Sequence, residues 1–254
     1  MHYLYTAKGK DSAFHFSYTI LYMNARIKVI AFDADDTLWN LQSYFDQVEK
    51  EYCALLSDYG SARFISAELF KTESANMAEL GYGVKAFTLS LIENAIRVSN
   101  GTVPAETLQR IMKAGRSLHF IPATPLPGVY ETLKTLHERG EQQMILFTKG
   151  ELLDQEQKLI RSGLRPFFHD VHIVSDKTDD AYRHLCNLSF CSPESFMMVG
   201  NSFKSDILPV LRLGGWGVHI PSPYEWQHEK TEEFDHEHLI RLSHFAELLT
   251  CGIL

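Results

Sequence analysis

The sequence predicts an α/β fold with a three-layer, Rossmann-like parallel sheet and an inserted α-helical cap domain. Five short apolar runs rich in β-forming residues occur at 27–33, 143–148, 171–175, 196–200 and 216–220. The last four alternate with helical patterns at 128–139, 151–162, 179–187 and 204–213. Strand-like runs are missing between residues 40 and 121. Strands that alternate with helices predict a parallel sheet covered on both faces.

Glycines mark the ends of two predicted helices. Gly140 and Gly163 each follow a helical pattern, where a left-handed residue closes a helix. Each apolar run is short enough to be one buried strand. The sequence therefore predicts a core domain made of residues 27–39 and 122–254.

The stretch at 40–121 is predicted to be the helical cap. Amphipathic patterns at 44–59 and 84–98 follow one another there. Pro122, Pro125, Pro127 and Gly128 mark its end, where proline stops one helix and stands near the start of the next. Residues 1–26 are predicted to be either an N-terminal extension or a segment upstream of a true start at Met23, since they do not resemble a signal peptide.

The composition excludes several classes of function. A formal net charge of -8 argues against a nucleic-acid partner, which requires clustered Lys and Arg. Apolar runs are too short to span a membrane. The four cysteines are widely spaced without a zinc-finger pattern, which is typical of reduced thiols in a cytoplasmic protein. The oligomeric state is unknown from the sequence.

Acidic residues follow the first predicted strand in the segment DADDT. Asp33 stands at the strand tip and Asp35 two residues on. In an open α/β sheet the ligand crevice lies at the carboxyl ends of the strands. Paired acids there can act as nucleophile and as general acid/base. An isolated DxD is as often a structural turn, so it needs support from other strand ends.

Other predicted strand ends supply complementary groups. Thr148 and Lys149 end the second run before a helix, where a hydroxyl and backbone N–H groups can bind phosphate, although Thr148 alone could be a helix cap. Lys177 follows the third run and could neutralise a phosphoryl oxygen, although a lone lysine is usually exposed. Asn201 and Asp206 follow the fourth run, where oxygen ligands for Mg²⁺ are wanted.

Together these segments resemble the four ordered motifs of the haloacid dehalogenase-like superfamily over residues 27–220. The resemblance implies an Mg²⁺-dependent hydrolase of phosphomonoesters. In such an enzyme Asp33 forms an aspartyl-phosphate, Asp35 is acid and then base, and Thr148 and Lys177 hold the phosphoryl group. Asp33, the Asp35 backbone carbonyl and the acidic motif, here Asn201 and Asp206, would bind the metal. The motif leaves two arrangements open: Asp206 is a direct ligand, or it orients Asn201 and Lys177 without touching the metal. A helical cap between the first two motifs resembles the subgroup of phosphoglycolate-type phosphatases and sugar-phosphate mutases.

Two positions depart from the usual pattern. Asp36 stands where many members have Gly, and Asn201 replaces the first acid of the fourth motif. The dehalogenases that founded the superfamily act on carbon without a metal and need no second acid, so Asp35 favours phosphoryl transfer. Two alternatives stay open: a phosphomutase, and a non-enzymatic binding protein whose metal site Asn201 has weakened.

The predicted partner is a small phosphorylated metabolite. Tyr82 and Lys85 interrupt two helical patterns of the cap and are predicted to contact the leaving group; the alternative is that Tyr82 is core and Lys85 a solvated helix start. The acidic, histidine-bearing stretch at 225–238 is predicted to be surface, without a histidine metal site.

Overall fold

Six parallel strands form one sheet in the order β3-β2-β1-β4-β5-β6 in the computed structural model, which describes residues 27–224 and 226–254. The strands are β1 (Val29–Phe32), β2 (Gln143–Lys149), β3 (Asp170–Val174), β4 (Phe196–Gly200), β5 (Trp216–His219) and β6 (Leu239–Arg241). The predicted parallel sheet is confirmed, and the first five strands coincide with the five apolar runs. The expectation for residues 1–26 lies outside the described residues.

The sixth strand was not predicted. β6 pairs in parallel with β5 at the edge of the sheet, with Val218 opposite Ile240. Its three residues are too few for a recognisable apolar run.

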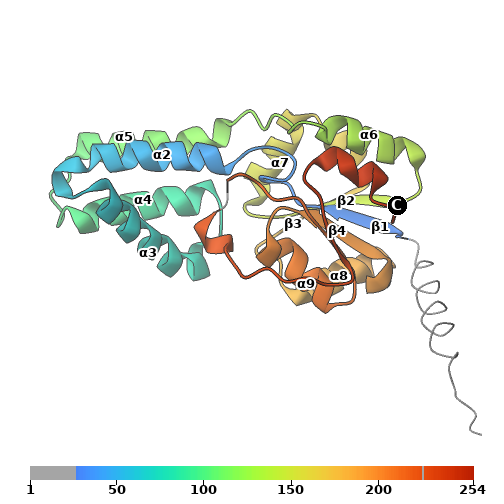
Figure 1. The fold of residues 1–254 in the computed structure, drawn as a ribbon. Coiled ribbons are helices and arrows are strands. Elements are labelled where there is room, and N and C mark those ends of the chain that lie inside the picture. The colour runs from blue at the N-terminus through green and yellow to red at the C-terminus, as the bar shows by residue number, and fades with distance from the viewer. Residues whose placement is uncertain (1–26, 225) are drawn as a thin grey trace, which may run out of the picture.

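Helices cover both faces of the sheet, as predicted for a three-layer fold (Figure 1). They are α6 (Val129–Arg139), α7 (Leu152–Ser162), α8 (Asp179–Leu188) and α9 (Leu208–Arg212). Side chains of β1 alternate between the faces because successive residues of a strand point in opposite directions. Ile30 and Phe32 belong to the apolar cluster with α6 and α7, and Val29 and Ala31 to the cluster with α8 and α9.

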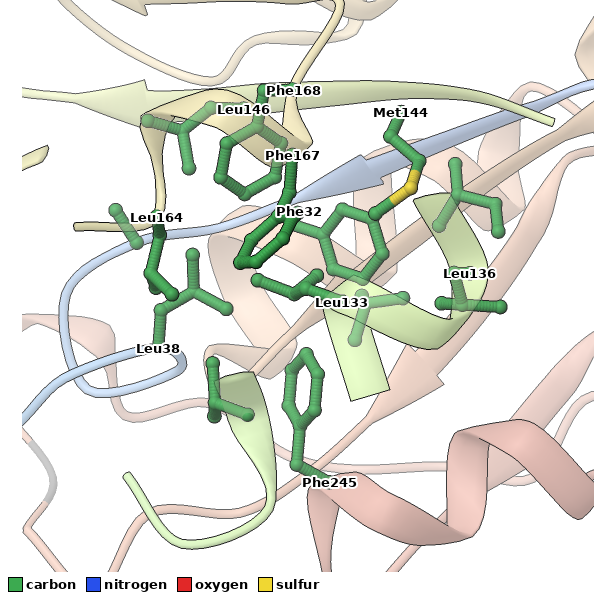
Figure 2. Packing of buried hydrophobic residues seen from close by; sticks show 14 of the residues in the cluster. Phe32, Leu38, Leu133, Leu136, Met144, Leu146, Leu164, Phe167, Phe168 and Phe245 are labelled. Carbon is green, nitrogen blue, oxygen red and sulfur yellow. The ribbon is translucent and has the colours of Figure 1, made fainter. Parts of the chain in front are cut away.

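Aromatic packing fixes the end of β1. Figure 2 shows Phe32 surrounded by buried side chains of the first cluster. Its ring lies 5.9 Å from that of Phe168, edge-on, and 6.0 Å from that of Phe245. Because Phe32 directly precedes Asp33, this packing also holds the predicted nucleophile in place.

The helix predicted at 204–213 is instead a π-helical turn (Phe203–Ile207) followed by the short α9. Pro209 has no N–H to donate to the carbonyl four residues earlier, so the regular ladder cannot continue there. The Tyr182 hydroxyl lies 2.9 Å from Ser205 O and 3.2 Å from Asp206 O and donates to one of these carbonyls at a time.

Residues between β1 and α6 form a helical bundle beside the sheet (Figure 1). Its helices are α2 (Gln42–Leu55), α3 (Ala62–Leu80), α4 (Val84–Val98) and α5 (Ala105–Ser117). The bundle buries an apolar cluster of its own, which includes Tyr52, Leu69 and Leu91. The two segments that connect it to the sheet meet at Trp39, which is fully buried and bridges to Pro125.

Two further findings concern the described residues as a whole. None of their helices is long and apolar enough to cross a membrane. The four cysteines are free thiols.

Candidate active site

The polar groups predicted at the strand ends meet in one cavity. Its volume is about 420 Å³, and it lies between the carboxyl edge of the sheet and the helical bundle. The predicted residues among its walls are Asp33, Asp35, Tyr82, Thr148, Lys149, Lys177, Asn201 and Asp206. Parallel strands place their carboxyl ends side by side, which is why residues far apart in sequence converge here.

Lys177 lies between two carboxylates at the base of the cavity. Its Nζ is 2.5 Å from Asp33 Oδ1 and 2.6 Å from Asp206 Oδ1. Burial alone would lower the pKa of Lys177, but Asp206 and Asp33 raise it above its ordinary value. Two carboxylates sharing one ammonium leave a net negative charge, which favours a further cation nearby.

Asp206 is almost completely buried, and both its carboxylate oxygens have partners. Oδ1 accepts from Lys177 and Oδ2 accepts from the backbone N–H of Ser202 at 3.0 Å. Gly200 makes this approach possible, because a β-carbon there would overlap the Asp206 carboxylate. Burial raises the pKa of Asp206 to about 7 against the opposing effect of Lys177.

Thr37 brings the oxygens of Asp33 and Asn201 together. Its Oγ1 is 2.9 Å from Asp33 Oδ2 and 3.0 Å from Asn201 Oδ1, and it accepts the Asn201 backbone N–H at 3.0 Å. A hydroxyl has one proton, so it donates to only one of the two oxygens at a time.

These donors fit a hard cation. A carboxylate, an amide oxygen and a backbone carbonyl are ligands that Mg²⁺ accepts, together with several waters. Across the parts of the chain that the structure describes, no group of three or more His, Cys, Asp or Glu side chains has the geometry of a metal site. A metal ion held here would need oxygen ligands besides carboxylates, and the Asn201 amide and backbone carbonyls are of the right chemical type.

Asp35 makes contacts that the sequence did not predict. Its carboxylate accepts from Lys158 Nζ at 2.8 Å on both oxygens, from Trp39 Nε1 at 2.8 Å and from Gln155 Nε2 at 2.7 Å. Lys158 also lies 3.2 Å from Asp154 Oδ2. Burial alone would lower the pKa of Lys158, but Asp35 and Asp154 raise it.

Three polar residues on the buried face of α7 were thus missed: Asp154, Gln155 and Lys158. A signal was present, since Asp154 and Lys158 are four residues apart and lie on one helix face. Which partner they face could not be told, because Asp35 lies 123 residues from Lys158.

Thr148 and Lys149 both line the cavity, but they differ in their partners. Thr148 is buried at the end of β2. The ammonium of Lys149 donates to Ser205 Oγ at 3.0 Å, pairs with Glu229 and lies 4.4 Å from the centre of the Tyr82 ring. Burial alone would raise the pKa of Glu229, but Lys149 lowers it to about 2.

The two cap residues predicted to contact the leaving group differ in their position relative to the cavity. Tyr82 lines the cavity, with its ring 5.8 Å from that of Trp226. Lys85 does not line it: its ammonium pairs with Glu151 Oε2 at 2.5 Å and the side chain is 65% exposed. Glu151 at the start of α7 thus holds Lys85 beside the cavity, and its contact with the leaving group stays a prediction.

The stretch predicted to be surface also contributes to the site. Trp226 and Glu229 line the cavity, and the ring of His228 stacks on Phe70 of α3 with centroids 4.2 Å apart. High polarity predicts a solvated loop, and residues 230–235 are exposed accordingly, but Glu229 faces Lys149, Ser202 and Ser205.

Asp36 keeps the turn after β1 in shape. It has a φ of 61°, the left-handed region that Gly or Asp tolerates. Its Oδ1 accepts the backbone N–H groups of Leu41 and Gln42 at 2.9 and 3.0 Å. Burial raises the pKa of Asp36 to about 7, against these hydrogen bonds.

The fold and the ordered strand-end motifs define a class of enzyme. A model of haloacid dehalogenase-like hydrolases matches residues 27–214, so the chain belongs to the haloacid dehalogenase-like hydrolase family. A haloacid dehalogenase-like family hydrolase from Xanthomonas campestris has a similar crystal structure. The TM-score is 0.79 at 32% identity, and the match covers 89% of this chain and 91% of that one.

Curated relatives carry phosphatase names. The glyceraldehyde 3-phosphate phosphatase of Methanothermobacter thermautotrophicus is 26% identical over 202 residues, which cover 74% of this chain and 83% of the relative. The enzyme of the same name from Methanocaldococcus jannaschii is 27% identical over 206 residues, which cover 76% and 85%.

Proposed function

We propose that this chain is an Mg²⁺-dependent phosphomonoester hydrolase that acts on a small phosphorylated metabolite through a phosphorylated Asp33. The observation that carries the proposal is the convergence of Asp33, Thr148, Lys177 and Asn201 at one end of a cavity. A nucleophile, a hydroxyl, a cation and metal-binding oxygens in one place are the parts that phosphoryl transfer requires.

Hydrolysis then takes two steps. An oxygen of Asp33 attacks phosphorus, the bond from phosphorus to the leaving oxygen breaks, and Asp35 gives that oxygen its proton. Asp35 next takes a proton from water, whose oxygen attacks phosphorus and releases Asp33 and phosphate. Lys177 and Thr148 hold phosphoryl oxygens in both steps. To act as acid, Asp35 must carry a proton and turn one oxygen from Lys158 toward the cavity.

We assign the metal to Asp33, the Asp35 backbone carbonyl and Asn201. Mg²⁺ there would supply positive charge that offsets the negative charge of the transferring group. Asp206 is instead proposed to position Lys177, because its two oxygens are buried and engaged. This assignment chooses between the two arrangements that the fourth motif left open.

The bundle of α2–α5 is proposed to be the cap that selects the leaving group, with Tyr82 as a contact. It supplies most of the cavity wall opposite the strand ends. Lys149 is proposed to link core and cap, since it reaches both Glu229 and the Tyr82 ring.

Hydrolysis is favoured over transfer to a second hydroxyl because the curated relatives are named as phosphatases. The hydrogen bonds from Lys177 to Asp33 and Asp206 likewise argue against a binding protein with a decayed active site. Four free thiols support a reducing compartment, and we propose the cytoplasm.

A panel of phosphomonoesters that includes an aryl phosphate and glyceraldehyde 3-phosphate, assayed with and without Mg²⁺, tests the proposal. We expect phosphate release that needs the metal and is lost in Asp33→Asn. Asp180→Asn, at an exposed acid on α8, is the matched control and should retain activity. Turnover that persists without Mg²⁺ or in Asp33→Asn would contradict the proposal.

A further inference from the structure

The cavity extends from the strand ends into the helical bundle. Its far wall carries Phe45 and Glu49 from α2, Phe70, Glu73 and Met77 from α3, and Phe87 from α4. A volume of about 420 Å³ is within the range of about 300–1,000 Å³ typical of small-molecule sites. With the phosphoryl group at the strand ends, this wall faces the alcohol part of the substrate.

Two partly buried carboxylates on this wall have no basic partner of the Lys or Arg type among the described residues. Glu49 accepts a hydrogen bond from Ser66 at 2.5 Å. The side chain of Glu73 is 14% exposed, and its basic neighbour is His228, whose Nε2 lies 3.4 Å away. That buried nitrogen has no hydrogen-bond partner.

The lysines that line the cavity do not pair with Glu49 or Glu73. Lys177 is held by Asp33 and Asp206, Lys158 by Asp35 and Asp154, and Lys149 by Glu229, while Lys230 is exposed. Lys50 and Arg63 line a second pocket that shares Glu49 with this cavity, but no ion pair among the described residues joins either of them to Glu49.

The carboxylates also affect one another. Burial raises the pKa of Glu49, and the charges of Glu73 and of the exposed Asp46 raise it further. Like charges in a partly buried wall repel, and a cation placed between them relieves both the repulsion and the cost of burial.

Aromatic rings line the same wall as these acids. The Phe70 ring stacks on His228, and the rings of Phe45 and Phe87 lie 5.0 Å apart. Carboxylates next to aromatic faces are the surroundings that bind ammonium groups, through ion pairing and cation–π attraction.

We infer that the substrate is the phosphate ester of an amino alcohol, whose ammonium group binds between Glu49 and Glu73 against the Phe70 ring. The inference rests on the proposed phosphatase function and adds the charge of the leaving group. A leaving group with a carboxylate or a second phosphate meets repulsion on this wall. A neutral one, such as the glyceraldehyde in the relatives' name, makes no use of the two charges.

Binding of non-hydrolysable phosphonates to the full chain with Mg²⁺ tests the inference without relying on turnover. Three series of matched length are compared by calorimetry, ending in an ammonium, a methyl and a carboxylate group. We expect the best ammonium ligand to bind at least about tenfold more tightly than its methyl counterpart, as for one hydrogen bond to a charged group. The carboxylate ligand should bind most weakly.

Glu49→Gln and Glu73→Gln should each reduce the preference for ammonium over methyl. Glu79→Gln, at an exposed acid on the same helix α3 and outside the cavity wall, should keep it. Equal binding of the ammonium and methyl ligands, or an undiminished preference in both cavity variants, would overturn the inference. Hydrolysis of an aryl phosphate by the same preparation reports on the phosphatase proposal separately, because that substrate carries no ammonium.

Discussion

Replacing Lys158 with methionine removes a buried cation while keeping most of the side-chain volume. Lys158 is 2% exposed and holds the carboxylates of both Asp35 and Asp154. Removing one partner of a buried ion pair costs about 3–5 kcal/mol, because the charges left behind are neither paired nor solvated.

The hydrogen bonds that Asp35 and Asp154 keep in this variant place the cost near the lower end of that range. Asp35 keeps Trp39 and Gln155 as donors, and Asp154 keeps His119, whose Nδ1 is 3.2 Å away. We therefore expect a loss of about 3 kcal/mol in the free energy of unfolding. For a chain of this size that corresponds to a fall in Tm of about 6–12 °C.

Differential scanning calorimetry at neutral pH measures the fall. Lys134→Met, at an exposed lysine on α6, is the control and should stay within about 0.5 kcal/mol of the wild type. Adding Asp154→Asn to Lys158→Met should recover part of the loss, because one uncompensated charge is then removed. A single variant as stable as the wild type would refute the ion-pair account of Asp35.

Three further predictions concern the site. Asp35→Asn should slow hydrolysis of alkyl phosphates by about 10²–10⁴-fold and of nitrophenyl phosphate much less, since nitrophenolate leaves without a proton; equal losses on both would contradict the general-acid role. Asn201→Asp should lower the Mg²⁺ concentration for half-maximal rate, whereas Asp206→Asn should reduce kcat and leave that concentration nearly unchanged; the opposite pattern in a rate titration would exchange their roles. The pKa of Glu229 is lowered from 4.5 to about 2, so its stabilising contribution is present above pH 4.5 and lost as the pH falls toward 2. The difference in Tm between wild type and Glu229→Gln should narrow over that range. A constant difference would show that ionisation of Glu229 does not contribute to stability.

Elements set by local pattern could be predicted from the sequence. β4 and α4 have the predicted bounds, because an apolar run between turns and a helical periodicity each specify an element locally. The strand-end groups Asp33, Thr148, Lys177 and Asn201 could also be predicted to converge, since parallel topology brings their strands together.

Partners that depend on tertiary packing could not be predicted. Lys158 meets Asp35 across 123 residues, and Glu229 meets Lys149 across 80. Lys85 showed the same limit in reverse, because Glu151, 66 residues away, holds it outside the cavity wall. β6 was missed because pairing with β5, rather than its own three residues, makes it a strand.

The most direct measurement of the central claim is chemical trapping of the phosphorylated enzyme. Turnover of a labelled aryl phosphate with Mg²⁺ is quenched in acid, and the protein is digested and analysed by mass spectrometry. The account predicts one phosphoryl group on the peptide that contains Asp33, lost on treatment with hydroxylamine and absent in Asp33→Asn. Phosphate release during turnover with the label on another residue, or with no protein-bound label at any quench time, would contradict Asp33 as the nucleophile.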